Sequence, residues 1–175
     1  MGFDLVCVSG GKGIRGPQSA GILMGRKDLI AAARLNAPPR GGNIGRGMKV
    51  NKEEILGMYV ALEKIFNLDH AKLWKTWEER VALMATAAAK IEGVTTSISL
   101  PAVANRRPTL NISWDIKKVK VTKDEFQQRL SNGEPSIEVI GGKDNSINIT
   151  SWSLQPGEEK IVAKRLKEEL GKASA

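Results

Sequence analysis

The sequence has almost no cysteine or histidine, few aromatic residues and no long apolar run. Its single cysteine, Cys7, excludes an internal disulfide framework, and its single histidine, His70, has no second histidine and no cysteine near it in the sequence for a zinc site. No stretch approaches the ~18 consecutive apolar residues of a membrane-spanning helix. The opening MGFDLVCV is too short for a secretory signal peptide. We therefore expect a cytoplasmic protein without a metal site or membrane contact, in which Cys7 is a small buried core residue.

Acidic residues are scarce in the first part of the chain. Residues 1–50 carry eight Lys/Arg against two Asp, a net charge of +6, whereas residues 51–175 carry nineteen basic against seventeen acidic residues, a net charge of +2. The basic excess predicts either binding of phosphate, nucleic acid or another acidic ligand, or simply a solvated basic surface. With 175 residues, 41% of them hydrophobic, the chain can form one domain, or one domain and part of another.

The first half of the chain predicts two short strands followed by helices. Apolar runs at 3–9 and 19–25 are typical of strands, residues 26–36 predict a helix, and the proline- and glycine-rich segment 37–49 predicts a loop. Asn51 and Glu54 have the spacing of a capping box that begins the next helix. A third helix is expected from Asp69 to Gly93. Apolar residues at spacings of four, three and four predict the buried face of the second helix: Ile55, Tyr59, Leu62 and Phe66.

The second half predicts a small α+β domain. Strands are expected at 94–100, 109–114, 136–140 and 146–152, and helices at 123–132 and 155–171. Thr122 and Glu125 form another capping-box pattern, and Gly171 is the expected end of the last helix. This order predicts an antiparallel sheet covered by helices on one face.

The segment VSGGKGIRGPQSAG, residues 8–21, holds five glycines around Lys12. Gly11, Gly13 and Gly16 match the dinucleotide-binding pattern, but a strand-like run follows Pro17 where that pattern requires a helix. A phosphate-binding loop would need glycine six positions before the lysine and Ser or Thr after it, and the sequence has Val6 and Gly13 there. Neither nucleotide-binding interpretation fits.

Lys12 itself offers a third interpretation. A lysine among small residues at the end of a buried strand would be partly desolvated, which favours the neutral, nucleophilic amine. Such a lysine suits covalent attachment of pyridoxal phosphate, with glycines that let a flat cofactor approach and Ser9 offering its hydroxyl to the phosphate. The alternative is a surface lysine in a loop, which composition alone favours.

Three segments carry a resemblance to a known family: DLVCVSGGKGIRGPQSAGILMGRKDLI (4–30), GRGMKVNKEEILGMYVALE (45–63) and, more loosely, RLSNGEPSIEV (129–139). The chain resembles fold-type-I pyridoxal-phosphate enzymes related to bacterial selenocysteine synthase (L-seryl-tRNA selenium transferase). Within them it is most similar to the selenocysteine-synthase-like branch, which includes D-glucosaminate-6-phosphate ammonia lyase.

The resemblance implies an α/β fold of type I, present as the end of the large domain plus a small α+β C-terminal domain. The implied divisions are 1–50 for the large-domain remnant, 51–92 for linking helices and 93–175 for the small domain. Lys12 matches the Schiff-base lysine, the cofactor is pyridoxal 5'-phosphate, and Gly16 and Pro17 shape the turn after the lysine. The remaining residues that the resemblance assigns are Ser9 and Gly11 for cofactor binding, and Gln18, Arg15 and Arg46 for substrate binding. Arg40 is a further basic candidate for an anionic substrate.

Two departures from the family limit what the resemblance implies. Selenocysteine synthases carry an acidic residue just before the lysine, where this chain has Gly11, which favours the small-molecule branch over a tRNA substrate. Only eleven residues precede Lys12, whereas the family places most of its large domain there. We therefore expect a C-terminal fragment, inactive alone, of a homo-oligomeric β-eliminating lyase acting on an amino acid or phosphorylated amino-sugar acid. The alternatives are a selenium transferase-like enzyme on seryl-tRNA and a non-enzymatic basic α+β binding domain.

Overall fold

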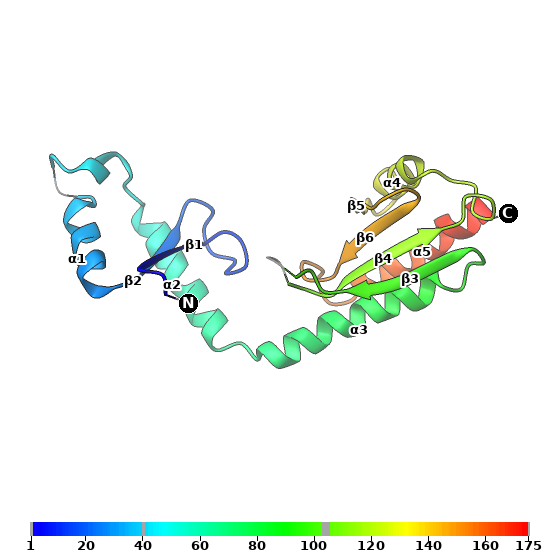
Figure 1. Cartoon of the computed structure of the whole chain (residues 1–175), viewed down its shortest axis with the longest axis horizontal. Helices are drawn as coiled ribbons and strands as arrows, with labels where there is room; N and C mark the ends of the chain where they lie inside the picture. Colours follow the sequence, from blue (N-terminus) through cyan, green and yellow to red (C-terminus); the bar gives the residue numbers. More distant parts are fainter. Residues whose placement is uncertain (1, 40, 103–105, 175) are drawn as a thin grey trace. The chain divides into compact units, whose positions relative to one another are not determined.

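The chain divides into two compact units, Met1–Asp69 and His70–Ala175 (Figure 1). The computed structural model describes residues 2–39, 41–102 and 106–174. The division falls between the two long helices that we expected to link the domains, so each helix belongs to a different unit. The three-part division into 1–50, 51–92 and 93–175 stays a prediction for the protein.

The first unit contains a two-stranded antiparallel sheet, two helices and a 3-10 turn. Its elements are β1 (Leu5–Ser9), β2 (Gly21–Gly25), α1 (Lys27–Asn36), η1 (Ile44–Gly47) and α2 (Lys52–Phe66). The strands pair so that Leu5 lies opposite Gly25 and Ser9 opposite Gly21. The expected capping box begins α2, because the backbone N–H of Asn51 donates to Glu54 Oε2 at 3.1 Å.

The first unit buries few of its apolar side chains. Of its described residues only Gly10, Ala20, Met58 and Ala61 are buried. The predicted buried face of α2 is wrong for three of its four residues: Ile55 and Tyr59 are each 59% exposed and Phe66 is 80% exposed, whereas Leu62 is partly buried. The face of α2 that packs is instead the one bearing Met58 and Ala61, because the residues between β1 and β2 cover it.

Cys7 is also exposed, which corrects the expectation that it is a buried core residue. It lies in the middle of β1, where four of the five residues are exposed. The continuous apolar run LVCV predicts a strand covered on both faces. Within the described residues of this unit, β1 pairs with β2 alone, so the strand forms as predicted but its faces stay open.

The second unit is a four-stranded antiparallel sheet packed against three helices. Its elements are α3 (His70–Ala88), β3 (Val94–Ser99), β4 (Thr109–Trp114), α4 (Lys123–Ser131), β5 (Ile140–Gly141), β6 (Ser146–Thr150) and α5 (Glu158–Ser174), with strand order β3-β4-β6-β5. Burial alternates along β4, where Leu110, Ile112 and Trp114 are buried and the residues between them are not. The prediction of an antiparallel sheet with one covered face is therefore confirmed.

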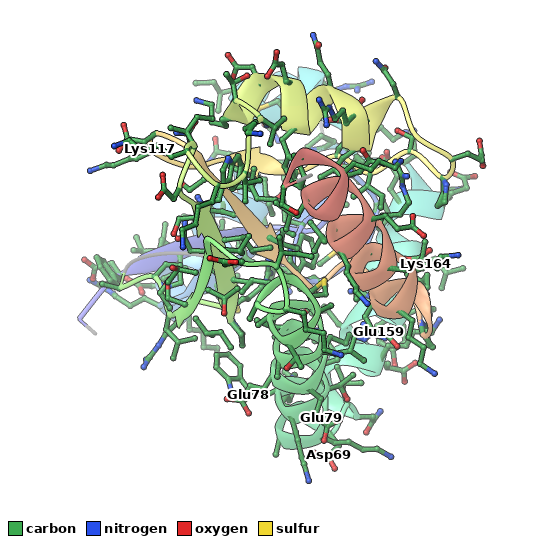
Figure 2. All side chains as sticks on the ribbon, turned by 90° about the vertical axis from the view of Figure 1, so that its right-hand side faces the viewer. Asp69, Glu78, Glu79, Lys117, Glu159 and Lys164 are labelled. Atoms are coloured by element: carbon green, nitrogen blue, oxygen red, sulfur yellow. The ribbon has the colours of Figure 1, made fainter. Side chains whose placement is uncertain are left out.

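The hydrophobic core of the described chain lies in the second unit. It joins the covered face of the sheet to α3, α4 and α5, and charged residues such as Glu78, Glu79 and Lys164 lie on the outer side of these helices (Figure 2). The fully buried members with the largest side chains are Phe126, Met84, Leu110, Ile112, Leu130, Ile147, Leu166 and Leu170.

Several predicted boundaries in this unit differ from the structure: the helix expected to reach Gly93 ends at Ala88, and the strand expected at 146–152 ends at Thr150. The strand expected at 136–140 is limited to Ile140–Gly141, because residues 136–139 lie outside the ladder. Here Gln127 on α4 donates from Nε2 to the Val139 carbonyl at 3.0 Å, and Ile137 N–H bonds to Leu130. The last helix does not end at Gly171 but continues to Ser174. No helix within the described ranges has both the length and the apolar character to cross a membrane.

The Thr122 cap of α4 provides a test of the local sequence rules. Glu125 N–H donates to Thr122 Oγ1 at 3.3 Å, and Thr122 N–H donates to Glu125 Oε2 at 2.9 Å, as the capping-box pattern predicts. We expect Thr122→Ala to lower the free energy of unfolding of the second unit by about 1 kcal/mol, measured by urea denaturation. Thr86→Ala, at an exposed threonine inside α3, is the control and should leave stability unchanged or slightly raised. Equal losses in the two variants would contradict the capping role.

Candidate functional site

Lys12 lies in a tight loop, residues 10–20, that joins β1 to β2; we call this segment the lysine loop (Figure 1). Backbone hydrogen bonds close the loop both at its base and at its tip. Gly10 N–H donates to the Ala20 carbonyl at 2.9 Å, at the base, and Gly16 N–H donates to the Gly10 carbonyl at 2.8 Å. At the tip, Arg15 N–H donates to the Lys12 carbonyl at 2.9 Å. Lys12 is therefore part of a closed turn.

The glycines of the lysine loop make room for α2. A Cβ atom at Gly10 would lie 2.6 Å from Met58 Sδ and 2.6 Å from the Ala20 carbonyl oxygen. At Gly16 it would lie 2.9 Å from Met58 Sδ and 3.3 Å from Ala61 Cβ. Both distances to sulfur are closer than side chains ordinarily approach. A side chain at Gly10 would thus meet the Ala20 carbonyl, and both glycines pack against Met58. The expectation that the glycines make space for a flat cofactor stays a prediction.

One face of α2 contacts the lysine loop, and we call its residues Glu54, Gly57, Met58 and Ala61 the α2 seat. Their spacing of three, one and three places them on one side of the helix. Ser19 Oγ donates to Glu54 Oε1, and a Cβ at Gly57 would lie 3.0 Å from Pro17 Cγ. Glu54 therefore caps α2 through one carboxylate oxygen and holds the loop through the other.

The structure brings five of the six predicted site residues onto this hairpin: Ser9 at the end of β1, and Gly11, Lys12, Arg15 and Gln18 in the lysine loop. Lys12 is exposed, so the predicted partial desolvation of its amine is wrong for the described unit. Gln18 Nε2 donates to the Gly11 carbonyl at 3.4 Å. Gln18 thus contacts the residue before the lysine, while its role toward a substrate stays a prediction.

The two remaining basic candidates are not residues of the lysine loop. Arg46 is an exposed residue of η1, and Arg40 lies outside the described residues. The α2 seat was missed from the sequence, where Ile55 and Tyr59 dominated the apolar pattern. A signal for the seat was present, because Gly57 and Ala61 are small residues four apart and allow close approach of another backbone.

The second unit has two polar clusters that the sequence did not indicate. The Arg107 guanidinium lies 3.9 Å from the Trp152 ring centroid and 5.9 Å from that of Trp77. On the same side of α3, Arg80 donates to the Leu154 carbonyl at 2.6 Å and lies 3.5 Å from Glu159 Oε2. These contacts fix the segment between β6 and α5 against α3. The described residues show no group of three or more His, Cys, Asp or Glu that could bind a metal.

The fold of the chain is similar to that of two solved structures. No family model matches the chain. A solved D-glucosaminate-6-phosphate ammonia-lyase is similar over 99% of this chain and 45% of its own, with a TM-score of 0.68 and 23% identity. A solved complex of SepCysS with the SepCysE N-terminal domain is similar over 97% and 46%, with a TM-score of 0.60 and 14% identity.

Two curated proteins agree with this result at the level of sequence. The chain is 28% identical over 169 residues to a 5'-C-glycyluridine monooxygenase-decarboxylase from Streptomyces. It is 26% identical over 172 residues to the D-glucosaminate-6-phosphate ammonia lyase of Salmonella typhimurium. Each match covers 95% of this chain but only 41% and 43% of the relative. The resemblance stated from the sequence is thereby confirmed, and the chain spans less than half the length of these relatives.

Proposed function

We propose that this chain carries the cofactor lysine of a pyridoxal-phosphate-dependent lyase of fold type I, with Lys12 as the covalent attachment site. One observation carries the proposal: Lys12 is exposed in a closed turn between two strands, in a chain similar to an ammonia lyase over 95% of its length. An accessible amine on a fixed backbone is what covalent attachment of an aldehyde cofactor requires.

The residues present fit one side of that cofactor. Lys12 Nζ would hold it covalently, and the Ser9 hydroxyl, exposed at the end of β1, would donate to its phosphate. When bound, the cofactor would take up the electron pair left on the substrate α-carbon. Lys12 Nζ, once displaced by the substrate amine, would accept the α-proton, and the leaving group on the β-carbon would depart with its bonding electrons.

We propose an anionic amino-sugar acid as the substrate class, because the ammonia lyase relative acts on D-glucosaminate 6-phosphate by its name. Arg15 lies in the lysine loop and Arg46 in η1, within the segment that carries a net charge of +6. Guanidinium groups bind phosphate and carboxylate through paired N–H donors. Arg15 and Arg46 are therefore the proposed anion-binding residues.

The rest of the pocket would come from polypeptide outside these 175 residues. The first unit exposes apolar side chains on both strands and around α2, among them Leu5, Met24, Leu56 and Tyr59. A helix and strands with apolar residues on all sides are typical of elements covered on several faces. We propose that polypeptide corresponding to the rest of the relatives' large domain covers these apolar residues and completes the site in a homo-oligomer. We also propose that this chain alone does not turn over substrate.

A labelling experiment tests the attachment site. The chain is mixed with pyridoxal 5'-phosphate, reduced with borohydride, digested and mapped by mass spectrometry. We expect the pyridoxyl label mainly on Lys12, and its loss in Lys12→Arg, while Lys27→Arg, at an exposed lysine that begins α1, serves as the matched control and leaves the Lys12 label unchanged. Equal labelling of Lys12, Lys27 and Lys49 would overturn the proposal.

The monooxygenase-decarboxylase relative supports a second candidate, since its identity of 28% slightly exceeds that of the ammonia lyase. In this candidate the same lysine serves decarboxylation of a glycyl-nucleoside. The reactions distinguish the two: an ammonia lyase releases ammonia from an amino-sugar acid, whereas a monooxygenase-decarboxylase consumes dioxygen and releases carbon dioxide from a glycyl group. The SepCysS neighbour, at 14% identity, shows the fold alone and does not favour a tRNA substrate.

A further inference from the structure

We propose that Met58 on α2 is the positioning residue for Lys12, acting through the lysine loop. This inference rests on the proposed function, which names Lys12 but assigns nothing to α2. Met58 is only 5% exposed in a unit that buries few residues, and its sulfur faces the positions where Cβ atoms would stand on both Gly10 and Gly16. These glycines are the two residues whose backbone hydrogen bond closes the loop around Lys12.

The physical argument begins with what holds the loop. Three backbone hydrogen bonds of the loop span Gly10–Gly16, Lys12–Arg15 and Gly10–Ala20. Gly10 and Ala20 are buried at the base of the loop, whereas Lys12 and Arg15 are exposed at its tip, where water competes for their hydrogen bond. Burial of the Met58 side chain against the loop is the apolar contact that favours the closed form. Loss of that side chain leaves the same hydrogen bonds without packing, so the loop should open more often.

The remaining seat residues make Met58 the central contact. Glu54 and Gly57 contact the Ser19 and Pro17 end of the loop, and Ala61 adds one methyl group near Gly16. Only Met58 reaches both Gly10 and Gly16 among the contacts described. Opening of the loop would swing the Lys12 backbone away from Ser9 and the end of β1. The amine would then lose its fixed relation to the proposed phosphate donor, although it would remain exposed.

Amide hydrogen exchange followed by NMR tests this inference without the cofactor. In Met58→Ala we expect the Arg15 and Gly16 amides to exchange about tenfold faster, because opening of the loop exposes both N–H groups. Met58→Leu should restore protection, since leucine conserves the volume. Met48→Ala is the matched control, because Met48 is 76% exposed beyond η1. Unchanged Arg15 and Gly16 exchange in Met58→Ala would overturn the inference.

A double-mutant cycle distinguishes loss of the contact between Met58 and Gly16 from general unfolding of the first unit. Gly16→Ala adds a methyl group 2.9 Å from Met58 Sδ and should by itself speed exchange of the Arg15 amide. Adding Met58→Ala removes that clash, so the double variant should exchange more slowly than the sum of the single effects predicts. The Asn67 amide, which donates to Glu63 at the end of α2, reports whether the helix persists. Strict additivity of the two changes would contradict a shared contact.

The pyridoxyl label gives the readout that a purely structural role would not move. We expect Met58→Ala to lower the label on Lys12 several-fold relative to the labels on Lys27 and Lys49 of the same molecule, and Met58→Leu to restore it. Faster amide exchange with an unchanged Lys12 share would overturn the positioning role. If Lys12 of the unaltered chain takes no preferential label, the proposed function fails, and the exchange data still decide whether Met58 fixes the loop.

Discussion

Replacing Phe126 by alanine should lower the free energy of unfolding of the second unit by about 3–5 kcal/mol. Phe126 is fully buried on α4, and its ring centroid lies 5.2 Å from that of Trp114 at an interplanar angle of 57°. Trp114 is itself fixed, because its Nε1–H donates to the Val121 carbonyl at 2.8 Å. The surroundings therefore cannot collapse freely into the cavity, which places the loss toward the upper end of the range.

Tryptophan fluorescence during urea denaturation measures this loss in the second unit alone. All four tryptophans, Trp74, Trp77, Trp114 and Trp152, lie in His70–Ala175. Leu83→Ala is the matched control, because Leu83 is 38% exposed on α3 and its truncation should cost well under the Phe126 loss. A loss of less than about 1 kcal/mol in Phe126→Ala would contradict the assigned core.

The lysine loop supplies a second readout in the same experiment. It belongs to Met1–Asp69, whereas the core around Phe126 belongs to the other compact unit. We expect amide exchange of Arg15 and Gly16 to be unaffected by Phe126→Ala under conditions where the second unit is still folded. The stability of the core and the order of the proposed attachment site would then be separable properties of the chain.

Much of the second unit could be predicted because its elements contact one another. The alternation in TLNISW directs Leu110, Ile112 and Trp114 to one face of β4, and that face meets helices of the same unit. The capping residues Thr122 and Glu125 act within four residues of each other, so the sequence alone determines them. The strand expected at 136–140 is shorter in the structure. The Val139 carbonyl accepts from the Gln127 side chain and Ile137 N–H donates to the Leu130 carbonyl, so these groups do not bond to a neighbouring strand.

In the first unit, the apolar pattern predicted the helix and the strand but not which of their residues are buried. The apolar spacing of Ile55 and Tyr59 correctly predicted a helix, yet both residues are exposed. A periodic pattern gives the element, but it cannot tell which face meets another part of the same unit when apolar residues surround the helix. Cys7 is the same case in a strand, where an apolar run predicted covering elements that the unit does not contain.

For the candidate site, the sequence likewise identified the residue but not its surroundings. Lys12 could be found because glycine density and the family resemblance both mark it. Its setting could not, since contact between Met58 and Gly16 joins residues more than forty positions apart and depends on how the hairpin meets α2. Of the glycines that suggested room for a cofactor, Gly10 and Gly16 also pack against Met58, and the cofactor interpretation stays a prediction.

The last prediction concerns Glu169, a buried carboxylate on α5. Glu169 Oε1 accepts hydrogen bonds from Lys172 Nζ at 2.7 Å and from Arg165 Nη1 at 3.0 Å. Burial raises the pKa of Glu169, but the hydrogen bonds and charges of Lys172 and Arg165 outweigh it, so the pKa lies below its ordinary value of 4.5. Glu169→Ala should cost about 3–5 kcal/mol at neutral pH, because it leaves the nearly buried Arg165 guanidinium without this partner.

The direction of the pH dependence follows from the lowered pKa. A carboxylate whose folded pKa is depressed stabilises the fold above its unfolded pKa, and this contribution is lost as the pH falls through the folded value. Glu169→Gln removes the charge and retains an oxygen acceptor. The difference in the free energy of unfolding between this variant and the unaltered chain, the stability gap, should therefore be largest at neutral pH and should decrease below pH 4.5. Glu168→Gln is the matched control, since Glu168 is 41% exposed and 3.9 Å from Arg165. A gap that stays constant from neutral pH to about pH 3, or an equal effect of Glu168→Gln, would show that the charge of Glu169 does not stabilise the second unit.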